Sequence, residues 1–445
     1  MTSTHSVLVL LALALGGSAA AQPGAPAPAQ PSSPAIAATA TPGPREEALT
    51  LPRAVEIAMQ QQPNVRATKA SIEAARGRVD QALVARRPQL SVDASVGTVS
   101  SNGSFFDPAV RTGLGASASW RLYDFGQTSA NIRAAEANAA AVEASFGTTT
   151  LDIESTVSIT FLEAVARLRL IAVADATVKS EDLHLDQARK FVAAQAKDPI
   201  EVVQAQARAA NARSALSQAQ ANAAVALANL RSAIGWIDPN VTFVVDQSWP
   251  TPPVEEPANL PTLVDSARKN RPEIVVLDKQ VLAGEASVNA AEAQNRPVLN
   301  AVARTGWDLG SGNWSAEPSW NAGLTLSWQI YDGGTSAASQ RVARANLAGV
   351  LANRDTLLVS LTSQLDAARS RIIANRANVT ASTEAVTAAR AQLQLADARY
   401  SQGLGSQIEF TDAQQAVTLA EGNLIQAEWQ LADAWAQLRR ALGKA

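Results

Sequence analysis

The chain has 445 residues, a net charge of −3, no cysteine and two histidines, of which His5 lies near the N-terminus. The lack of cysteine excludes thiol chemistry, disulfides and thiolate metal sites, and the balanced charge offers no basic stripe for nucleic acid. His184 lies in a charged helical stretch, where we expect a solvated side chain rather than a catalytic one. The composition therefore argues against an enzyme, and we expect no cofactor, no metal site and no nucleic-acid partner.

Residues 1–21 have the order of an export signal. An apolar run from Val7 to Leu15 is followed by small residues that end at Ala21, although no Lys or Arg precedes the run. The alternative, a membrane anchor, is disfavoured because the run is too short to span a bilayer. Without cysteine no lipid can be attached at the cleavage site. Residues 22–47 are rich in Pro and Ala and predict an extended linker.

A tandem repeat of about 200 residues organises the remainder. Motifs of the first half recur 208 or 209 residues later, Pro63 as Pro272, Pro88 as Pro297, Tyr123-Asp124 as Tyr331-Asp332, and Ile200-Glu201 as Ile408-Glu409. We assign residues 48–240 to repeat 1 and residues 258–445 to repeat 2. Residues 241–257, rich in Pro and Trp, are predicted to link them.

Each repeat is predicted to begin with two helices and two strands. A short helix covers 51–61 or 260–270, and a second begins at Pro63 or Pro272, since proline is tolerated in a first turn. The strands are expected at about 89–98 and 113–123, and again at about 298–308 and 320–331. Apolar and polar residues alternate along them, with tryptophan near their ends, which is typical of a membrane β-barrel. A half-buried strand of a water-soluble sheet alternates in the same way, but the aromatic ends and the export signal favour the membrane.

The triplet Asp124-Phe125-Gly126 follows the second strand and resembles the magnesium-binding segment of protein kinases. No glycine-rich phosphate loop, strand lysine or His-Arg-Asp loop accompanies it. Its counterpart in repeat 2, Asp332-Gly333-Gly334, occupies the same place between strand and helix. We interpret both as junctions, in which the aspartate lies at the positive end of the helix and Gly126 or Gly334 permits a tight turn.

A very long helix follows each junction. In repeat 2 it extends from about 334 to 402, with apolar residues every seven positions from Leu351 to Tyr400, which implies left-handed supercoiling. About 70 helical residues make a rod near 100 Å long. Return helices over 199–235 and 406–443, stacked on the shorter helices before the strands, match this length. The strands are therefore expected at one end of the rods and the helix tips at the other.

Four membrane strands leave open edges, which lipid does not tolerate because unpaired backbone groups there cost several kcal/mol each. Three chains would supply twelve strands, enough to enclose a lumen. The helices would then continue the tube.

The duplicated unit, with its Arg-Pro pairs, its Tyr-Asp-x-Gly junctions and the tip sequence YSQGLGSQIEFTDAQQAV at 400–417, resembles the TolC-type outer-membrane efflux protein family over about residues 48–443. The resemblance implies a mainly α fold with a small membrane β part. Two tandem repeats of helix, strand, strand, long helix and helix trimerise into a 12-stranded outer-membrane β-barrel that an α-helical barrel continues through the periplasm.

The implied function is that of a passive exit duct in a tripartite efflux or type I secretion system. Its expected partners are two further copies of the chain, a periplasmic adaptor, a proton-driven or ATP-driven inner-membrane pump, and outer-membrane lipid. The resemblance leaves the cargo open among drugs, metal ions, siderophores and proteins. The alternative is a soluble periplasmic coiled-coil adaptor or scaffold.

The family also implies a gate at the helix tips. Its tip motif is matched position by position by Tyr400, Gly403, Ser406, Glu409 and Asp412. By this resemblance, Glu409 and Asp412 form acidic rings at the aperture of the trimer. Alternatively both are ordinary acids of a first helical turn.

Two features of the tips depart from this pattern or extend it. Glu201, at the position equivalent to Glu409, is expected to hold the closed state with Tyr400. Gly405 stands where some members carry an arginine of a gating salt bridge, so we do not expect that salt bridge here. The first tip lacks the glycine and has Asp198-Pro199 instead, a helix-start signal.

Overall fold

A computed structural model describes residues 48–99, 109–238, 243–250, 256–309 and 317–444. The predicted signal peptide at 1–21 and linker at 22–47 lie outside these residues. These described residues belong to one structural unit.

The predicted helices and strands are confirmed in type and order. The first half contains α1 (Leu51–Gln61), α2 (Pro63–Val84), β1 (Gln89–Val99), β2 (Ala109–Tyr123), α3 (Gln127–Ala193) and α4 (Ile200–Ile234). The second half contains α5 (Leu260–Asn270), α6 (Pro272–Ala293), β3 (Val298–Leu309), β4 (Glu317–Ser327), α7 (Thr335–Ser401) and α8 (Gln407–Ala441). Proline stands in the first turn of α1, α2, α5 and α6, where no backbone donor is lost.

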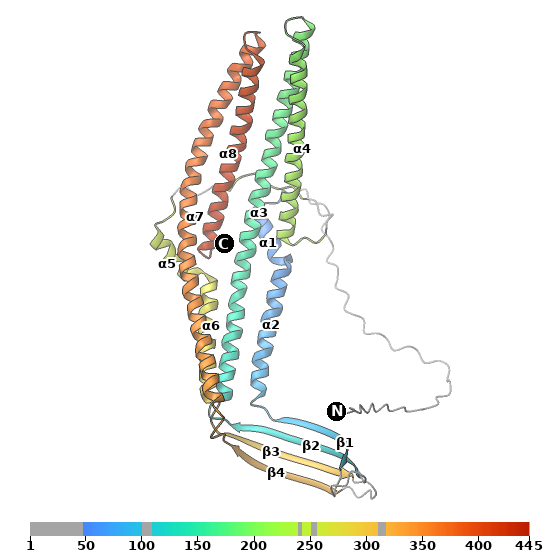
Figure 1. Cartoon of the computed structure of the whole chain (residues 1–445), viewed down its shortest axis with the longest axis vertical. Coiled ribbons are helices and arrows are strands. Elements are labelled where there is room, and N and C mark those ends of the chain that lie inside the picture. The colour runs from blue at the N-terminus through green and yellow to red at the C-terminus, as the bar shows by residue number, and fades with distance from the viewer. Residues whose placement is uncertain (1–47, 100–108, 239–242, 251–255, 310–316, 445) are drawn as a thin grey trace, which may run out of the picture. The chain divides into compact units, whose positions relative to one another are not determined.

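The two long helices carry the packing. Each long helix has 67 residues and packs against one helix of 22 residues and one return helix of 35 residues. Helix α3 packs against α2 and α4 in this way, and α7 packs against α6 and α8. Figure 1 shows the strands at one end of these helices and the α3–α4 and α7–α8 turns at the other. The predicted stacking is therefore correct. Helix α3 also packs against α6 and α8, so it joins the two halves.

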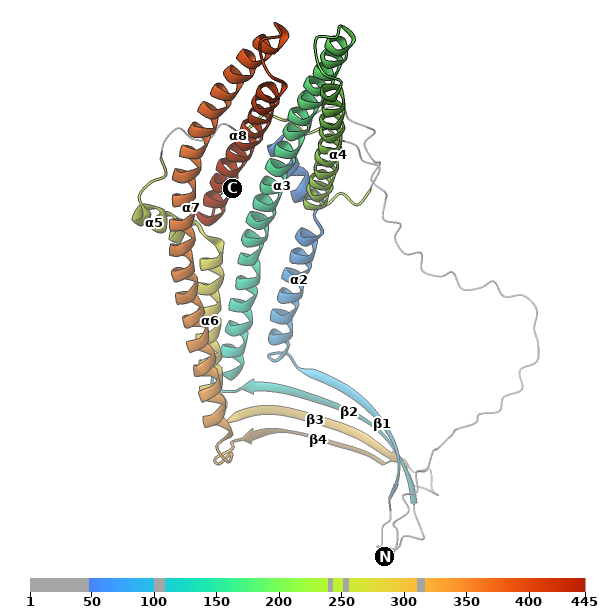
Figure 2. The same ribbon diagram turned by 45° about the horizontal axis from the view of Figure 1, so that its top comes forward.

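The four strands form one antiparallel sheet in the order β1-β2-β3-β4. Val92 pairs with Ala116, Ala118 with Ala303, and Ala303 with Ala322, and residues directly opposite share a face. The register thus places the alternating apolar residues of all four strands on one face, as their pattern predicts. Figure 2 shows that the sheet is curved.

The last predicted strand, 320–331, is wrong at its end. Strand β4 stops at Ser327, whereas β2 continues to Tyr123 because its last residues pair with β3. Strand β4 is an edge strand, so Trp328–Tyr331 find no ladder partner within the described part of the chain. The indole Nε1 of Trp328 instead donates to the carbonyl of Asn295 at 3.2 Å, as that of Trp120 donates to Arg86 at 2.9 Å.

The helices bury two equivalent apolar clusters. One joins α1, α3 and α4 around Val157, Phe161 and Leu230, and the other joins α5, α7 and α8 around Leu365, Ile372 and Leu438. Leu365 and Ile372 belong to the predicted seven-residue repeat. Val386 and Tyr400 of the same repeat are buried as well, but Leu351, near the sheet end of α7, is exposed.

The segment predicted to link the repeats, 241–257, packs against the first repeat around Val245. Val245 is buried in the first cluster, and its segment pairs with Leu49 through bonds from Leu49 N to the Val244 carbonyl (2.6 Å) and from Asp246 N to the Leu49 carbonyl (3.0 Å). The Pro-rich composition of the segment gave no indication that Val245 and its neighbours pack in this way. Residues 251–255 lie outside the described part. None of the described helices is long and apolar enough to cross a bilayer.

Gly235, which ends α4, should not tolerate a side chain. Its φ is +86°, and a Cβ would lie 2.9 Å from the Cα of Gln62. We expect Gly235→Ala to lower the free energy of unfolding by about 1–3 kcal/mol, measured from the thermal unfolding of the helices by circular dichroism. Gly77→Ala, inside α2 with nothing within 4 Å, is the matched control and should raise stability by about 0.5–1 kcal/mol. Equal effects of the two variants would contradict the prediction.

Candidate functional site

The two junction aspartates cap the long helices. The Asp124 carboxylate accepts from Thr128 N (2.7 Å) and Gly126 N (3.2 Å), and Asp332 accepts from Ser336 N (2.7 Å) and Gly334 N (2.9 Å). Gly126 and Gly334 have φ values of +99° and +91°, a conformation that favours glycine. The geometry is therefore that of a helix start. The described residues contain no group of three or more His, Cys, Asp or Glu that could hold a metal ion.

The charge of these aspartates is stabilised by their bonds. For Asp332 the hydrogen bonds from Ser336 and Gly334 lower the pKa. For Asp124 burial acts to raise the pKa, but the bonds from Thr128 and Gly126 outweigh it and the pKa is lowered. Arg296 of the second half donates from Nη1 to the Phe125 carbonyl at 2.6 Å, so the first junction is also tied to the second Arg-Pro pair.

The α7–α8 turn is a glycine turn closed by a helix cap. Gly403 has a φ of +74°, and the backbone N–H groups of Leu404 and Gly405 both donate to the Arg399 carbonyl at 2.9 Å. Ser406 Oγ accepts from Glu409 N at 3.1 Å. Gly405 is buried, and a Cβ there would lie 3.0 Å from Tyr400 N. A longer side chain at this position would force the turn to shift.

The α3–α4 turn reaches a comparable shape with other residues. Gln195 adopts a φ of +58° without being glycine, and the Asp198 carboxylate accepts from Ile200 N at 3.3 Å. Asp198-Pro199 thus starts α4 as predicted.

Tyr400 and Glu201 meet between the two tips. The Tyr400 hydroxyl donates to Glu201 Oε2 at 3.3 Å, and Gln407 Nε2 donates to the Glu201 carbonyl at 3.2 Å. Lys197 Nζ lies 3.3 Å from Glu201 Oε1 and 5.1 Å from the centre of the Tyr400 ring. Burial, reinforced by Glu201, raises the pKa of Tyr400 to about 12. The phenol therefore stays protonated and can donate.

Glu409 and Asp412 have different surroundings. Glu409 is half-buried, and its Oε1 lies 3.6 Å from Arg399 Nε. Asp412 is exposed and has no ion-pair partner within the described residues. The structure therefore gives Glu409 a cationic neighbour that the sequence pattern did not indicate.

The expectation that His184 is solvated is wrong. His184 is 1% exposed, and its ring stacks on Phe410 with centroids 4.5 Å apart and lies 4.8 Å from the Tyr400 ring. The helix that contains His184 is rich in charged residues, but the His184 side chain faces α7 and α8. The aromatic residues there are far away in sequence, so the local pattern did not indicate burial. We call the set around it the tip cluster: Glu181, His184, Phe191, Lys197, Glu201, Arg208, Tyr400 and Phe410.

The contact between α3 and α8, here the α3/α8 seam, contains four polar side-chain pairs in addition to the stack of His184 on Phe410. Side-chain contacts link Ser180 to Gln414 (2.7 Å), Thr177 to Thr418 (3.0 Å), Arg169 to Glu428 (3.3 Å) and Asp152 to Arg440 (2.6 Å). Apolar clusters near the tips lie instead within each helix pair, one between α3 and α4 and one between α7 and α8. The seam is thus chemically different from the packing inside each pair.

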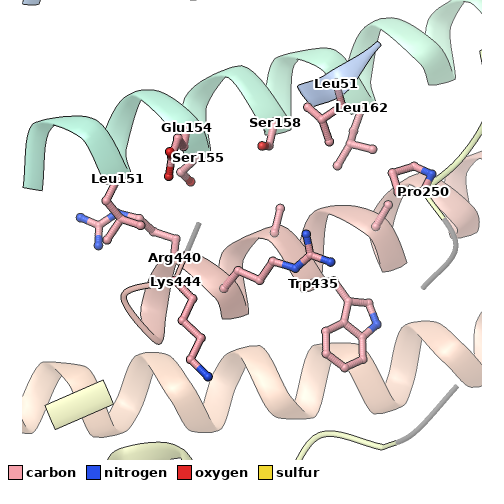
Figure 3. A pocket seen from close by; sticks show the side chains of 13 residues that line it. Leu51, Leu151, Glu154, Ser155, Ser158, Leu162, Pro250, Trp435, Arg440 and Lys444 are labelled. Atoms are coloured by element: carbon pink, nitrogen blue, oxygen red, sulfur yellow. The ribbon is translucent and has the colours of Figure 1, made fainter. Parts of the chain in front are cut away.

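A small cavity of about 80 Å³ opens in this seam near Arg440. Figure 3 shows Glu154, Ser155 and Ser158 of α3 above it and Trp435 of α8 below. Burial raises the pKa of Glu154. Beside the cavity, Arg440 also binds Glu273 of α6 at 2.7 Å, so one guanidinium connects three helices.

Removal of the Ser406 cap should loosen the second tip. We expect Ser406→Ala to cost about 1 kcal/mol locally, because Glu409 N loses its partner. Hydrogen exchange of the backbone amides at 407–410 should accelerate about fivefold, measured by mass spectrometry. Ser401→Ala is the control, since its hydroxyl donates only to a carbonyl of its own helix. Unchanged exchange in Ser406→Ala would show that the cap does not hold the turn.

Comparisons with known proteins fit this architecture. The sequence model described as outer membrane efflux protein matches residues 54–236 and 263–444. Outer membrane protein OprJ of Pseudomonas aeruginosa is 27% identical over 423 residues, covering 88% of this chain and 84% of OprJ. The outer-membrane channel OprN superimposes with a TM-score of 0.73 at 22% identity, covering 89% and 90% of the two chains. The open-state structure of the Neisseria gonorrhoeae MtrE channel gives 0.73 at 20% identity, covering 88% and 89%. With both repeats matched, the chain belongs to the outer membrane efflux protein family.

Proposed function

We propose that this outer-membrane exit duct is closed at its helix tips by the contact of Tyr400 with Glu201. The observation that carries the proposal is the 3.3 Å bond between them, which joins α7 of the second half to α4 of the first. Family membership favours the duct over the soluble adaptor that was the alternative.

The duct is a homotrimer. Each chain supplies four strands to a twelve-stranded barrel in the outer membrane, and the helices form the periplasmic tube. It works with a periplasmic adaptor and an inner-membrane pump in efflux or secretion. The pump is the source of energy, so we infer that the chain itself catalyses no reaction. We assign residues 1–21 as the signal peptide that directs it to the periplasm.

Opening requires the α7–α8 pair to separate from the α3–α4 pair at the tips. The bond from the Tyr400 phenol to the Glu201 carboxylate opposes this, as does Lys197, which contacts both residues. Because Tyr400 is buried and Glu201 is partly buried in the closed tip, breaking the bond leaves both groups to be solvated only once the gap is open. The adaptor then has to supply the free energy of separation.

Tyr400→Phe should increase the open fraction of the purified trimer. A hydrogen bond to a charged acceptor contributes about 1.5 kcal/mol or more, which corresponds to about tenfold in the open-to-closed ratio of each protomer. The measurement is conductance in planar lipid bilayers at pH 7.5. Tyr331→Phe, which alters an exposed tyrosine near the sheet, is the matched control and should conduct like the unaltered protein. A Tyr400→Phe trimer that also conducts like the unaltered protein would contradict closure at this contact.

We also propose that Asp412 forms the main acidic ring at the aperture. Asp412 is exposed and without an ion-pair partner in the described residues, whereas the charge of Glu409 is offset by Arg399 at 3.6 Å. In a trimer three Asp412 carboxylates would favour cations. The glycines of the tip, Gly403 and Gly405, allow the tight turn that presents them, and Ser406 fixes the start of α8.

Asp412→Asn should lower the preference for cations more than Glu409→Gln does. We expect at least about a twofold fall in the cation-to-anion permeability ratio for Asp412→Asn, obtained from reversal potentials across a KCl gradient. Glu384→Gln, on an exposed part of α7 away from the tip, should change nothing. If Glu409→Gln has the larger effect, the order of the two acids is reversed.

A further inference from the structure

The tip cluster contains a histidine that closure through Tyr400 does not explain. His184 is 1% exposed, and within the described residues neither of its ring nitrogens has a hydrogen-bond partner. Its ring instead stacks on Phe410 of α8 and contacts Tyr400 of α7. An imidazole without partners keeps its place here only by aromatic and apolar contact, and that contact crosses from one helix pair to the other.

The charged groups around His184 oppose its protonation. Arg208 comes from α4 and Lys197 from the α3–α4 turn, and both act to lower its pKa. The carboxylates that face the cluster lie beside other charged or polar groups: Glu181 Oε2 lies 3.4 Å from Arg208 Nε, an ion pair without a hydrogen bond, and Glu201 contacts Lys197 and Tyr400. From α7 and α8 the histidine meets the neutral Tyr400 and the ring of Phe410. Burial first, and then these two cations, lower the pKa of His184 to about 4.

We propose that His184 makes closure of the duct sensitive to protons, so that an acidic periplasm favours the separated tips. The inference rests on the proposed closure at Tyr400 and Glu201. In the closed tip a protonated imidazole would be buried without an acceptor, beside Arg208 and Lys197. Once the pairs separate, water can solvate it. The proton therefore binds more tightly to the open state than to the closed one, so acid favours opening.

The pH window follows from the two pKa values. In the open tip we expect the ordinary histidine value of about 6.5, against about 4 in the closed tip. Closure is at full strength above about pH 6.5 and weakens as pH falls toward 4. Between pH 7.5 and 5.5 the open-to-closed ratio should rise about tenfold for each protomer. Glu181 works in the opposite direction, because burial raises its pKa and acid favours its buried neutral form.

Conductance of the purified trimer at pH 7.5 and 5.5, in the same KCl concentration, tests this. In the unaltered protein the open-to-closed ratio should be about tenfold or more higher at pH 5.5 than at pH 7.5. His184→Phe retains a stacking ring but has no titratable group, so it should remain closed at both values. Glu409→Gln with Asp412→Asn should keep the acid response, which separates His184 from the aperture acids. An unaltered protein that does not respond to pH, or a His184→Phe trimer that still opens in acid, overturns the inference.

Histidine hydrogen–deuterium exchange read by mass spectrometry gives a second test, in which His184 itself is not substituted. In the full-length trimer the peptide that contains His184 should report a pKa well below 6.5 and slow exchange of the ring C–H. In the Tyr400→Phe trimer, whose open fraction at pH 7.5 is expected to be larger, the same peptide should report a pKa closer to 6.5. A value near 6.5 in the closed protein contradicts the role of His184. If Tyr400→Phe does not open the duct, the closure proposal fails, whereas an open Tyr400→Phe trimer with a pH-independent unaltered protein removes only the role of His184.

Discussion

Backbone groups within a bilayer must find their hydrogen-bond partners in protein, and the described four-stranded sheet leaves β1 and β4 with one neighbour each. The rest of the architecture depends on this constraint. Two open edges can be satisfied only by other copies of the chain, so closing the barrel also sets the number of helices in the tube below it. The curved sheet in Figure 2 is consistent with part of such a cylinder. The unpaired residues after Ser327 belong to the same edge.

The duplication, visible in the near-constant spacing of 208 residues, gives two similar halves, but the proposed closure depends on their differences. Glu201 and Glu409 are equivalent by position, yet Glu201 contacts Tyr400 while Glu409 contacts Arg399. The position equivalent to Tyr400 in the first half is Val192, and the position equivalent to Lys197 in the second is Gly405. A donor from one half and an acceptor from the other therefore meet once per protomer, and this asymmetry makes the contact specific.

Much of the fold was predictable because it depends on local patterns. Prolines, alternating strands and the seven-residue repeat located the described helices and strands. The tip motif identified Tyr400, and the repeat spacing from Glu409 identified Glu201, before the two were seen in contact. The errors have a common cause. His184, the segment around Val245 and the end of β4 are each decided by residues remote in sequence. His184 depends on Phe410 across the seam and Val245 on Leu49, while β4 ends where the described sheet offers it no further partner.

The polar pairs of the α3/α8 seam, as distinct from the stack of His184 on Phe410, bear on which parts of the molecule can move as units. Pairs such as Thr177 with Thr418 and Ser180 with Gln414 can exchange their partners for water at little net cost. The apolar clusters inside each helix pair cannot, because separating them exposes hydrocarbon. Each helix pair should therefore rotate as a rigid body about a point near Arg440 and its two carboxylates, Asp152 and Glu273. A displacement too small to disturb the sheet would then be amplified along the length of the helices into a much wider gap at their tips.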